Sequence, residues 1–576
     1  MNLLRMTLAL LLAAPALFCQ RAAGEARHWE HETSDLPVNA RLHFGKLDNG
    51  VRWVWMKNGE PKQRVYARLH VDVGSLSETE SEQGMAHFLE HMAFNGSEHF
   101  PAGTLVEWFQ KHGMAFGADT NASTSFSETV YKLDLPGNDE ASLRSGLSML
   151  GDVGHGLLLA PDEVKAEIGV IDGEERERDS VDFRAAIAGL KDEFSGTVVA
   201  SRIPIGIKSV RAAFTAPAVR AFYERWYRPE NLTVVIAGDL GDLDPVALIA
   251  EAFGGIGTPD SAPASEPPLG TPAHEHDTFT FYSSEIPVVT LSAERLKPWL
   301  DEPFDKAREL RDLPLEYAHR MLNIRFRELA RKEGAPFLSA AVSKAGGFKL
   351  LDGEELSVTA QPGKWKDALT VAEQELRRAV TYGFQAAELD ELRKNALHDL
   401  DEGVAREATR ASSSYVNEIL GAAEDRYVPT DAATDRALFK PAIEALSAKV
   451  VQDALAKAWT EGRARLSAIG GLDLGAEGGV ALKAAWEEST RSDVAAPAAV
   501  ATAAFAYAST PEGAGLVKEK THVEDLDFWQ VRFENGVRLD VKHTDYRERQ
   551  VLVNVRVGQG LLSLDPARAE LAHVAN

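Results

Sequence analysis

Short segments in which every second residue is apolar follow a tight turn near the start of the chain. Asn49 and Gly50 lie in this turn, and the apolar residues of the segment 65–71 show the alternation again. An Asn-Gly pair beside such segments is typical of a β-hairpin. The pattern predicts a hairpin followed by a strand with the single buried face that a period of two implies.

Other segments repeat their apolar residues every three or four positions, which is the spacing of an amphipathic helix. We expect helices at residues 83–94, 104–112, 161–178 and 363–381. Strands that are joined by tight turns and alternate with helices favour mixed or antiparallel sheets over a doubly wound parallel sheet. The sequence therefore predicts an α+β fold built from two-layer α/β units, with mixed, largely antiparallel sheets flanked by helices.

An internal repeat indicates that this unit recurs along the chain. The hairpin sequence at 47–52 returns at 533–538, and in the same register the apolar positions of 65–71 fall on 551–557. The second copy should therefore form a hairpin and a following strand as well.

A weaker repeat pairs residues 226–238 with 459–471, each an aromatic helix end that leads into an apolar strand and a glycine turn. It predicts two related α/β units. A proline-rich stretch and a loose alanine-rich stretch mark the linkers after them. The predicted organisation is a signal peptide at 1–26, a first unit at 35–255, a linker at 256–277, a second unit at 278–487, a linker at 488–525 and the start of a third unit at 526–576.

The first residues have the order of a secretory signal peptide: Arg5 precedes an apolar run from Met6 to Phe18, and small residues follow. These flanks favour export over a short buried helix, and the run is short for a membrane span. Cys19, the only cysteine, lies here, and bulky Leu17 disfavours the alternative of a lipid anchor on it. We expect an exported protein, periplasmic in a bacterium with two membranes, without a disulfide or a membrane span.

The net charge of the chain indicates which molecules are not expected to bind it. Lysine and arginine together number 62 against 87 acidic residues, a formal net charge of −25. Such a surface repels phosphate backbones and anionic lipids. We therefore expect neither nucleic acid nor an anionic membrane as a partner.

A short motif carries the candidate chemistry. His87 and His91 are four residues apart, so on a helix both imidazoles project from one face and can hold one metal ion. Glu90 lies on the same face, where a carboxylate can take a proton from a water that zinc activates. The order H-x-x-E-H is the inverse of the common H-E-x-x-H motif. The alternative is two surface histidines, which the apolar neighbours of this helix disfavour.

Catalytic zinc usually has three protein ligands and one water, so a distant carboxylate should complete the site. Glu167 and Glu174 are seven residues apart in the predicted helix 161–178 and therefore share a face. A helix so rich in charge is more often a solvated surface, and Glu175 is a further candidate. The residues alone leave the third ligand open.

These motifs resemble the pitrilysin/insulinase family of metallopeptidases, the inverzincins. The resemblance rests on the segment from His87 to Gly96 and on the later pair of glutamates, and extends through 100–103 and 117–125. It covers nearly the whole chain, repeated units included. It implies a half-clamshell in which the first unit is the catalytic zinc peptidase domain and the second is an inactive homologue.

The resemblance also implies roles for individual residues. One zinc ion is held by His87, His91 and Glu174, Glu90 is the general base, and Glu167 supports catalysis without being the principal ligand. The expected activity is endopeptidase or oligopeptidase cleavage of unfolded or short peptides.

The segment 117–125 resembles the family's substrate-binding edge strand. An unpaired edge offers backbone N–H and C=O groups to an extended peptide, with little dependence on side chains. We expect Asn121, Ala122 and Ser123 to bind substrate in this way; the alternative is an ordinary strand of small residues.

Two alternatives to a complete enzyme remain. A relative of the same fold can act as a non-catalytic peptide-binding or scaffold subunit. The third unit stops at Asn576, where the repeat places the counterpart of Glu90. Further C-terminal domains or a partner subunit are therefore expected to complete the chamber around the peptide.

Overall fold

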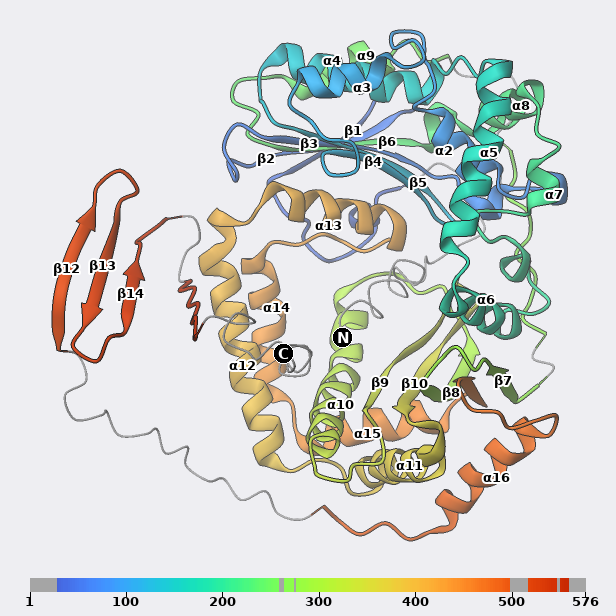
Figure 1. Cartoon of the computed structure of the whole chain (residues 1–576), viewed down its shortest axis with the longest axis vertical. Coiled ribbons are helices and arrows are strands. Elements are labelled where there is room, and N and C mark those ends of the chain that lie inside the picture. Colours follow the sequence, from blue (N-terminus) through green and yellow to red (C-terminus); the bar gives the residue numbers. More distant parts are fainter. Residues whose placement is uncertain (1–27, 258–263, 274–275, 498–515, 546–549, 559–576) are drawn as a thin grey trace. The chain divides into compact units, whose positions relative to one another are not determined.

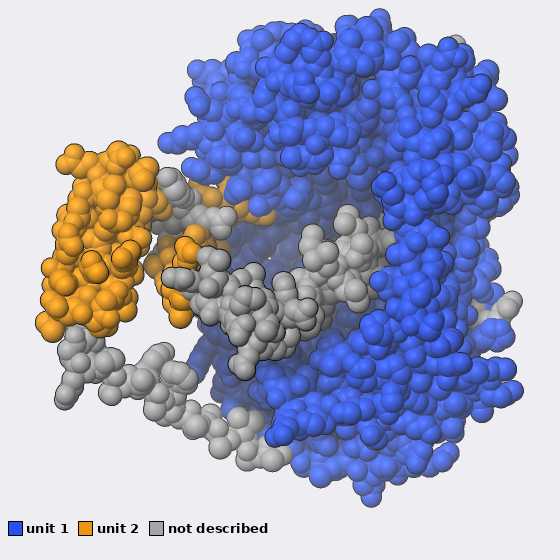
Figure 2. Space-filling view, in the orientation of Figure 1, with its two compact units in different colours: residues 1–401, 411–503 blue, residues 402–410, 504–576 orange. Residues whose placement is uncertain are grey.

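The computed structural model describes residues 28–257, 264–273, 276–497, 516–545 and 550–558. The predicted signal peptide, Cys19 and Asn576 lie outside these residues. The chain divides into two compact units, one of residues 1–401 with 411–503 and the other of 402–410 with 504–576 (Figure 2).

The first sheet has six strands in the order β1-β2-β6-β3-β5-β4. Only β2 and β6 run parallel. The strands are β1 (Leu42–Lys46), β2 (Arg52–Lys57), β3 (Val65–Val71), β4 (Thr120–Thr124), β5 (Thr129–Leu135) and β6 (Leu232–Gly238). The predicted hairpin is β1 and β2, and its turn requires Gly50 at a φ of 106°.

Both faces of this sheet are covered, which the alternation in 65–71 did not predict. All seven residues of β3 are buried. One face packs against helices that include α2 (Met85–Met92), α4 (Glu140–His155) and α9 (Pro245–Phe253). On the other face lies α13 (Ser412–Asp425), which contacts β3 and β6 (Figure 1).

The second sheet repeats this design with five strands in the order β7-β11-β8-β10-β9, in which only β7 and β11 run parallel. The strands are β7 (Thr278–Tyr282), β8 (Val289–Pro298), β9 (Ser339–Gly347), β10 (Leu351–Ala360) and β11 (Arg463–Gly470). The helices packed against it are α10 (Lys306–Ala330), α11 (Trp365–Tyr382), α15 (Ala448–Thr460) and α16 (Gly478–Arg491). Two mixed sheets flanked by helices confirm the predicted fold class.

The helices follow the predicted periodicity closely. The remaining ones are α3 (Thr104–Lys111), α5 (Pro161–Arg178), α6 (Val181–Glu193), α7 (Lys208–Arg211), α8 (Ala216–Trp226), α12 (Ala386–Arg406) and α14 (Ala432–Ala445). In both copies of the weaker repeat a helix leads into a strand as predicted, α8 into β6 and α15 into β11. Among the described residues, no helix has the length and apolar character needed to cross a bilayer.

A small antiparallel sheet belongs to the second unit. It consists of β12 (Val517–Val523), β13 (Phe528–Phe533) and β14 (Arg538–Val541), and it begins inside the range 488–525 that composition assigned to a linker. The hairpin predicted around Asn535 and Gly536 is β13 and β14. Residues 551–557 do not form the predicted strand. Their counterpart β3 lies between β5 and β6, whereas 551–557 pair with no strand among the described residues.

The packing of α13 on the first sheet gives a test of stability. Ile419 is 1% exposed, in a cluster with Val54, Met56 and Val235 of the sheet. Ile419→Ala should lower the free energy of unfolding by about 2–5 kcal/mol, because it leaves a cavity between helix and sheet. Asn417→Ala, at an exposed position of the same helix, should change it by less than about 0.5 kcal/mol. Urea unfolding measures both, and equal midpoints for the two variants would contradict this packing.

Candidate functional site

A buried carboxylate accepts hydrogen bonds from the backbone N–H groups at the N-terminus of helix α2. Glu78 accepts hydrogen bonds from the N–H groups of Gly84 and Ala86, both at 2.9 Å. A carboxylate in this position satisfies donors that the helix leaves unpaired. Burial raises the pKa of Glu78 well above its usual range, against the effect of these two donors. Glu78 thus fixes the start of the helix that carries the motif.

The two motif histidines and one glutamate of α5 bring their ligand atoms together. Nε2 of His87 and Nε2 of His91 lie 3.6 and 3.3 Å from the same oxygen, Oε2 of Glu174. Helices α2 and α5 are in contact, so the spacing within each helix becomes a shared site. Among the described residues, this is the group of His, Cys, Asp and Glu whose ligand atoms converge closely enough to hold a metal ion.

The electrostatics of this group suit a bound cation. Oε2 of Glu174 is buried, and no residue in the described part of the chain donates a hydrogen bond of normal geometry to it. Burial would raise the pKa of Glu174, but His91 and the other nearby positive groups lower it to about 2. Burial would lower the pKa of His91, yet Glu167 and Glu174 raise it to about 9. Burial and neighbouring His91 lower the pKa of His87 to about 3. Two imidazoles and an ionised carboxylate are a donor set that catalytic zinc uses, so the residues fit the ion.

Glu167 contacts the opposite side of the His91 ring. Its Oε1 lies 2.7 Å from Nδ1 of His91, and its Oε2 accepts a hydrogen bond from Nδ2 of Asn95 at 2.6 Å. A carboxylate on Nδ1 places the ring proton there and leaves Nε2 free for a metal. Glu167 therefore lies behind a candidate ligand and not among the converging atoms.

Glu175 faces away from the histidines. It lies 2.5 Å from the fully buried guanidinium of Arg211, which also contacts Asp172 at 2.8 Å. Arg211 further donates to the carbonyl of Ile205 at 2.7 Å, beside the start of α2 at Gly84. Of the three glutamates that the sequence left open, the structure thus brings Glu174 to both Nε2 atoms.

Glu90 is 8% exposed on the same helix. Its Oε2 accepts a hydrogen bond at 2.6 Å from Oγ1 of Thr124 on β4. Burial raises the pKa of Glu90, against the effect of this hydrogen bond. The candidate base is therefore tied to the strand that the sequence predicts to bind substrate.

That strand lies at the edge of the first sheet. β4 pairs with β5, and among the described residues it has no neighbouring strand on its other side. Asn121 and Ser123 are exposed and Ala122 is half-buried. The predicted edge strand is confirmed, whereas the binding roles of these three residues stay predictions.

Sequence reasoning did not find Glu78, Arg211 or Thr124, and it gave no role to Asn95. None of these four residues belongs to the pairs whose spacing in the sequence places them on one face of a helix. Glu78 and Thr124 act on α2 from outside that helix, and Arg211 joins α5 from a later element. A carboxylate a few residues before a predicted helix start was the one local signal, and it pointed to Glu78.

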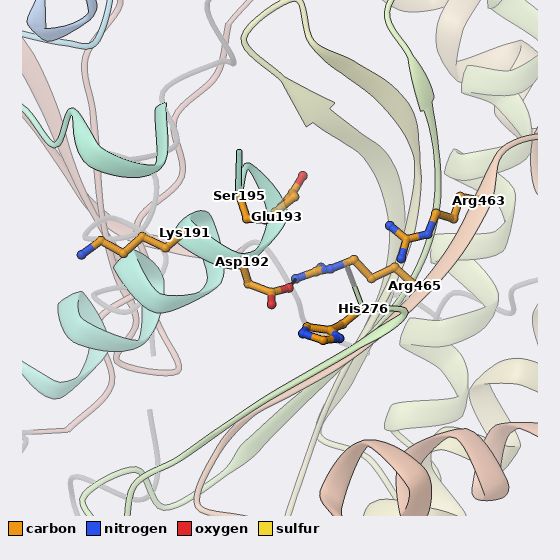
Figure 3. A pocket seen from close by; sticks show the side chains of 7 residues that line it. All are labelled: Lys191, Asp192, Glu193, Ser195, His276, Arg463 and Arg465. Atoms are coloured by element: carbon orange, nitrogen blue, oxygen red, sulfur yellow. Dashed lines mark hydrogen bonds and ion pairs between the residues drawn. The ribbon is translucent and has the colours of Figure 1, made fainter. Parts of the chain in front are cut away.

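A polar cavity of about 230 Å³ lies apart from these residues, between α6 and the second sheet (Figure 3). It is lined by Lys191, Asp192, Glu193, Ser195, His276, Arg463 and Arg465. Arg465 bridges Asp192 of α6 and Glu294 of β8, at 2.8 and 2.5 Å. The cavity is part of an ion-pair junction between the two α/β domains.

The comparisons with known proteins agree with this fold and site. The family Insulinase (Peptidase family M16) matches residues 53–188, and the family Peptidase M16 inactive domain matches 213–396. The chain is 29% identical over 404 residues to Probable zinc protease PqqL of Escherichia coli strain K12, covering 68% of this chain and 43% of that protein. Its namesake in Haemophilus influenzae is 36% identical over 218 residues, 38% of this chain and 24% of that protein.

Solved structures show the same fold. The first half of the periplasmic protease PqqL from Escherichia coli matches with a TM-score of 0.73 at 24% identity, over 80% of this chain and 99% of that one. The longer PqqL structure matches with a TM-score of 0.74 at 23% identity, over 88% of this chain and 56% of that one. The predicted α+β fold of two-layer units is thereby confirmed.

Fold and site together define a protein of the insulinase type. The chain belongs to the insulinase (M16) peptidase family, as the motifs predicted, and its curated relatives include proteins named as zinc proteases. The chain spans less than half the length of these two relatives.

The junction around Glu193 predicts a pH dependence of stability. Burial and the nearby Glu294 carboxylate raise the pKa of Glu193 from 4.5 to about 8. Between these values the folded state holds a proton that the unfolded state lacks, so stability falls as the pH rises through this interval. Glu193→Gln removes that proton linkage, and its stability relative to the unmodified chain should increase from pH 5 to pH 8.

Thermal unfolding at several pH values measures this difference. Glu328→Gln, at an exposed position of α10, is the control and should show no such trend. If the advantage of the Glu193→Gln variant shrinks with rising pH, the assignment is contradicted.

Proposed function

We propose that this chain is the zinc-bearing part of a peptidase that hydrolyses peptide bonds of unfolded or short peptides. The observation that supports it most directly is the convergence of His87, His91 and Glu174, with the buried carboxylate of Glu90 on the same helix. The family relatives named as zinc proteases support the same reading.

His87 and His91 would hold one zinc ion through Nε2 and Glu174 through Oε2. When bound, zinc polarises a scissile carbonyl and lowers the pKa of a water toward about 7. Glu90 would take the proton of the attacking water and later deliver it to the leaving amine. Thr124 would hold the Glu90 carboxylate in the orientation for this transfer, and Glu167 would hold the His91 ring.

The substrate would lie along the free edge of β4. Backbone groups of Asn121, Ala122 and Ser123 would pair with an extended peptide as an added strand. Thr124 follows directly in the same strand and contacts Glu90. A peptide added at this edge would therefore pass close to the base.

The relatives in this family are longer than this chain, so the complete activity would require further protein segments in addition to this chain. The chain matches 99% of the solved first half of PqqL. The metal site would be complete within it, and further domains or a partner subunit would close the chamber around the peptide. The predicted leader at 1–26 and the periplasmic protease among the solved relatives support export to the periplasm.

The alternative is a peptide-binding scaffold without catalysis. It would keep the edge strand but has no need for a buried base beside the metal ligands. The hydrogen bond of Thr124 to Glu90 therefore favours the enzyme.

Removal of the base is the first test. Glu90→Gln should lower peptide cleavage at least about 100-fold, because general base catalysis contributes roughly 10²- to 10⁴-fold. Zinc content should stay at the level of the unmodified chain, since Glu90 is not a ligand. Glu107→Gln, at an exposed site on α3, is the control and should retain activity. Retained cleavage by the Glu90 variant would overturn the mechanism.

Two adjacent glutamates distinguish the third ligand. Glu174→Gln should weaken zinc binding by more than the roughly 10- to 100-fold that loss of an outer partner costs. Glu175→Gln should weaken zinc binding by no more than this roughly 10- to 100-fold, because Glu175 contacts Arg211 and not the histidines. Competition with a chromogenic chelator measures both affinities. Tighter zinc binding by the Glu174 variant than by the Glu175 variant would sink the assignment.

A further inference from the structure

The turn between β4 and β5 is held in part by the second α/β domain. Phe126, in this turn, is 8% exposed, and its ring meets that of Phe348 edge-on with 4.9 Å between centroids. The Phe348 ring makes a similar contact with Phe194 at the end of α6, also at 4.9 Å. Phe348 is itself 9% exposed, although it lies at the tip of the β9–β10 hairpin. A hairpin tip normally faces solvent, so this burial calls for a reason.

The backbone of this tip is strained. Phe348 and Lys349 have φ values of 56° and 50°, and the N–H of Leu350 donates to the carbonyl of Gly347 at 3.0 Å. The strand register pairs Gly347 with Leu351, so the loop between the strands has three residues, and positive φ at its first two favours Asn or Gly there. A bulky aromatic residue with positive φ is an outlier that persists only when its surroundings hold it. The buried ring of Phe348 supplies such a constraint, from the opposite domain.

The turn that Phe348 contacts is connected to the candidate site. The carbonyl of Phe126 accepts a hydrogen bond from the N–H of Leu76 at 2.8 Å, so the turn is fixed on its own domain as well. Thr124, two residues before Phe126, ends β4 and donates to Glu90 at 2.6 Å. A shift of the turn would therefore move both the free edge of β4 and the partner of the base. The zinc ligands lie on α2 and α5 and would keep their positions.

We propose that Phe348 is a positioning residue for the catalytic site: the strained β9–β10 turn of the second domain holds the β4–β5 turn, and through Thr124 it orients Glu90. This inference rests on the proposed peptidase function and deepens it, because it gives the second domain a part in the reaction. The ring acts through Phe126 and Thr124 and does not touch substrate.

The sharpest variant is Phe348→Asn in the whole chain, which leaves buried Lys349 and its contact with the Trp299 ring in place. Asn adopts a positive φ more easily than Phe, so the backbone of the β9–β10 turn should be retained while the ring contact is lost. Amide hydrogen exchange at residues 120–124 should rise about tenfold or more, because β4 loses one of its supports. Exchange in β1 and β2 should not change. With zinc bound, kcat/KM for an unstructured peptide should fall about tenfold at unchanged zinc affinity.

Two further variants separate positioning from simple loss of stability. Phe348→Leu keeps an apolar side chain in the contact and should recover most of the protection of β4 and of the activity. Phe337→Ala removes a side chain of equal size, 2% exposed, from the core of the second domain. It should lower the stability of that domain without raising the exchange of β4 selectively.

The outcomes are distinct. Unchanged exchange of β4 in the Phe348→Asn variant would overturn the positioning role, and so would an equal rise in the Phe337 variant. If no form of the chain cleaves peptide, the proposed function fails, while the exchange data still decide whether Phe348 holds the strand.

Discussion

The candidate site depends on two helices being held side by side. His87 and His91 on α2 and Glu174 on α5 bring three ligand atoms within 4.8 Å of one another, although they come from distant parts of the chain. Because both helices bury polar side chains at this contact, the arrangement needs further support. Arg211 provides it, because its guanidinium is fully buried, pairs with two carboxylates of α5 and bonds to the carbonyl of Ile205 beside the start of α2.

The second α/β domain stabilises the first through packing and ion-pair contacts. The central strand β3 is buried on both faces, and the cover on one face is α13, which follows the second sheet's hairpins in the chain. Phe348 adds a contact at the β4–β5 turn, and Arg465 adds an ion-pair junction with α6. A domain that carries no metal ligands among its described residues can therefore still support the geometry of the site.

The sequence predicts what local periodicity controls. Helix 161–178 has the predicted bounds because its apolar spacing and Pro161 at the first turn are local signals, and the H-x-x-E-H spacing places its side chains on one face without knowledge of the fold. The choice among Glu167, Glu174 and Glu175 is not local. It follows from Arg211 and Asn95, which engage two of the three carboxylates from elsewhere in space. For the same reason the second buried face of β3 and the contact of Thr124 with Glu90 needed the structure.

The most direct test of this account is to remove metal with a chelator and titrate zinc back while cleavage of an unstructured peptide is followed. The account predicts that cleavage is lost with the metal and returns in proportion to bound zinc, reaching its full value at one ion per chain. Cleavage that is unaffected by the chelator, or a chain that binds one zinc ion at full occupancy and cleaves nothing, would contradict it.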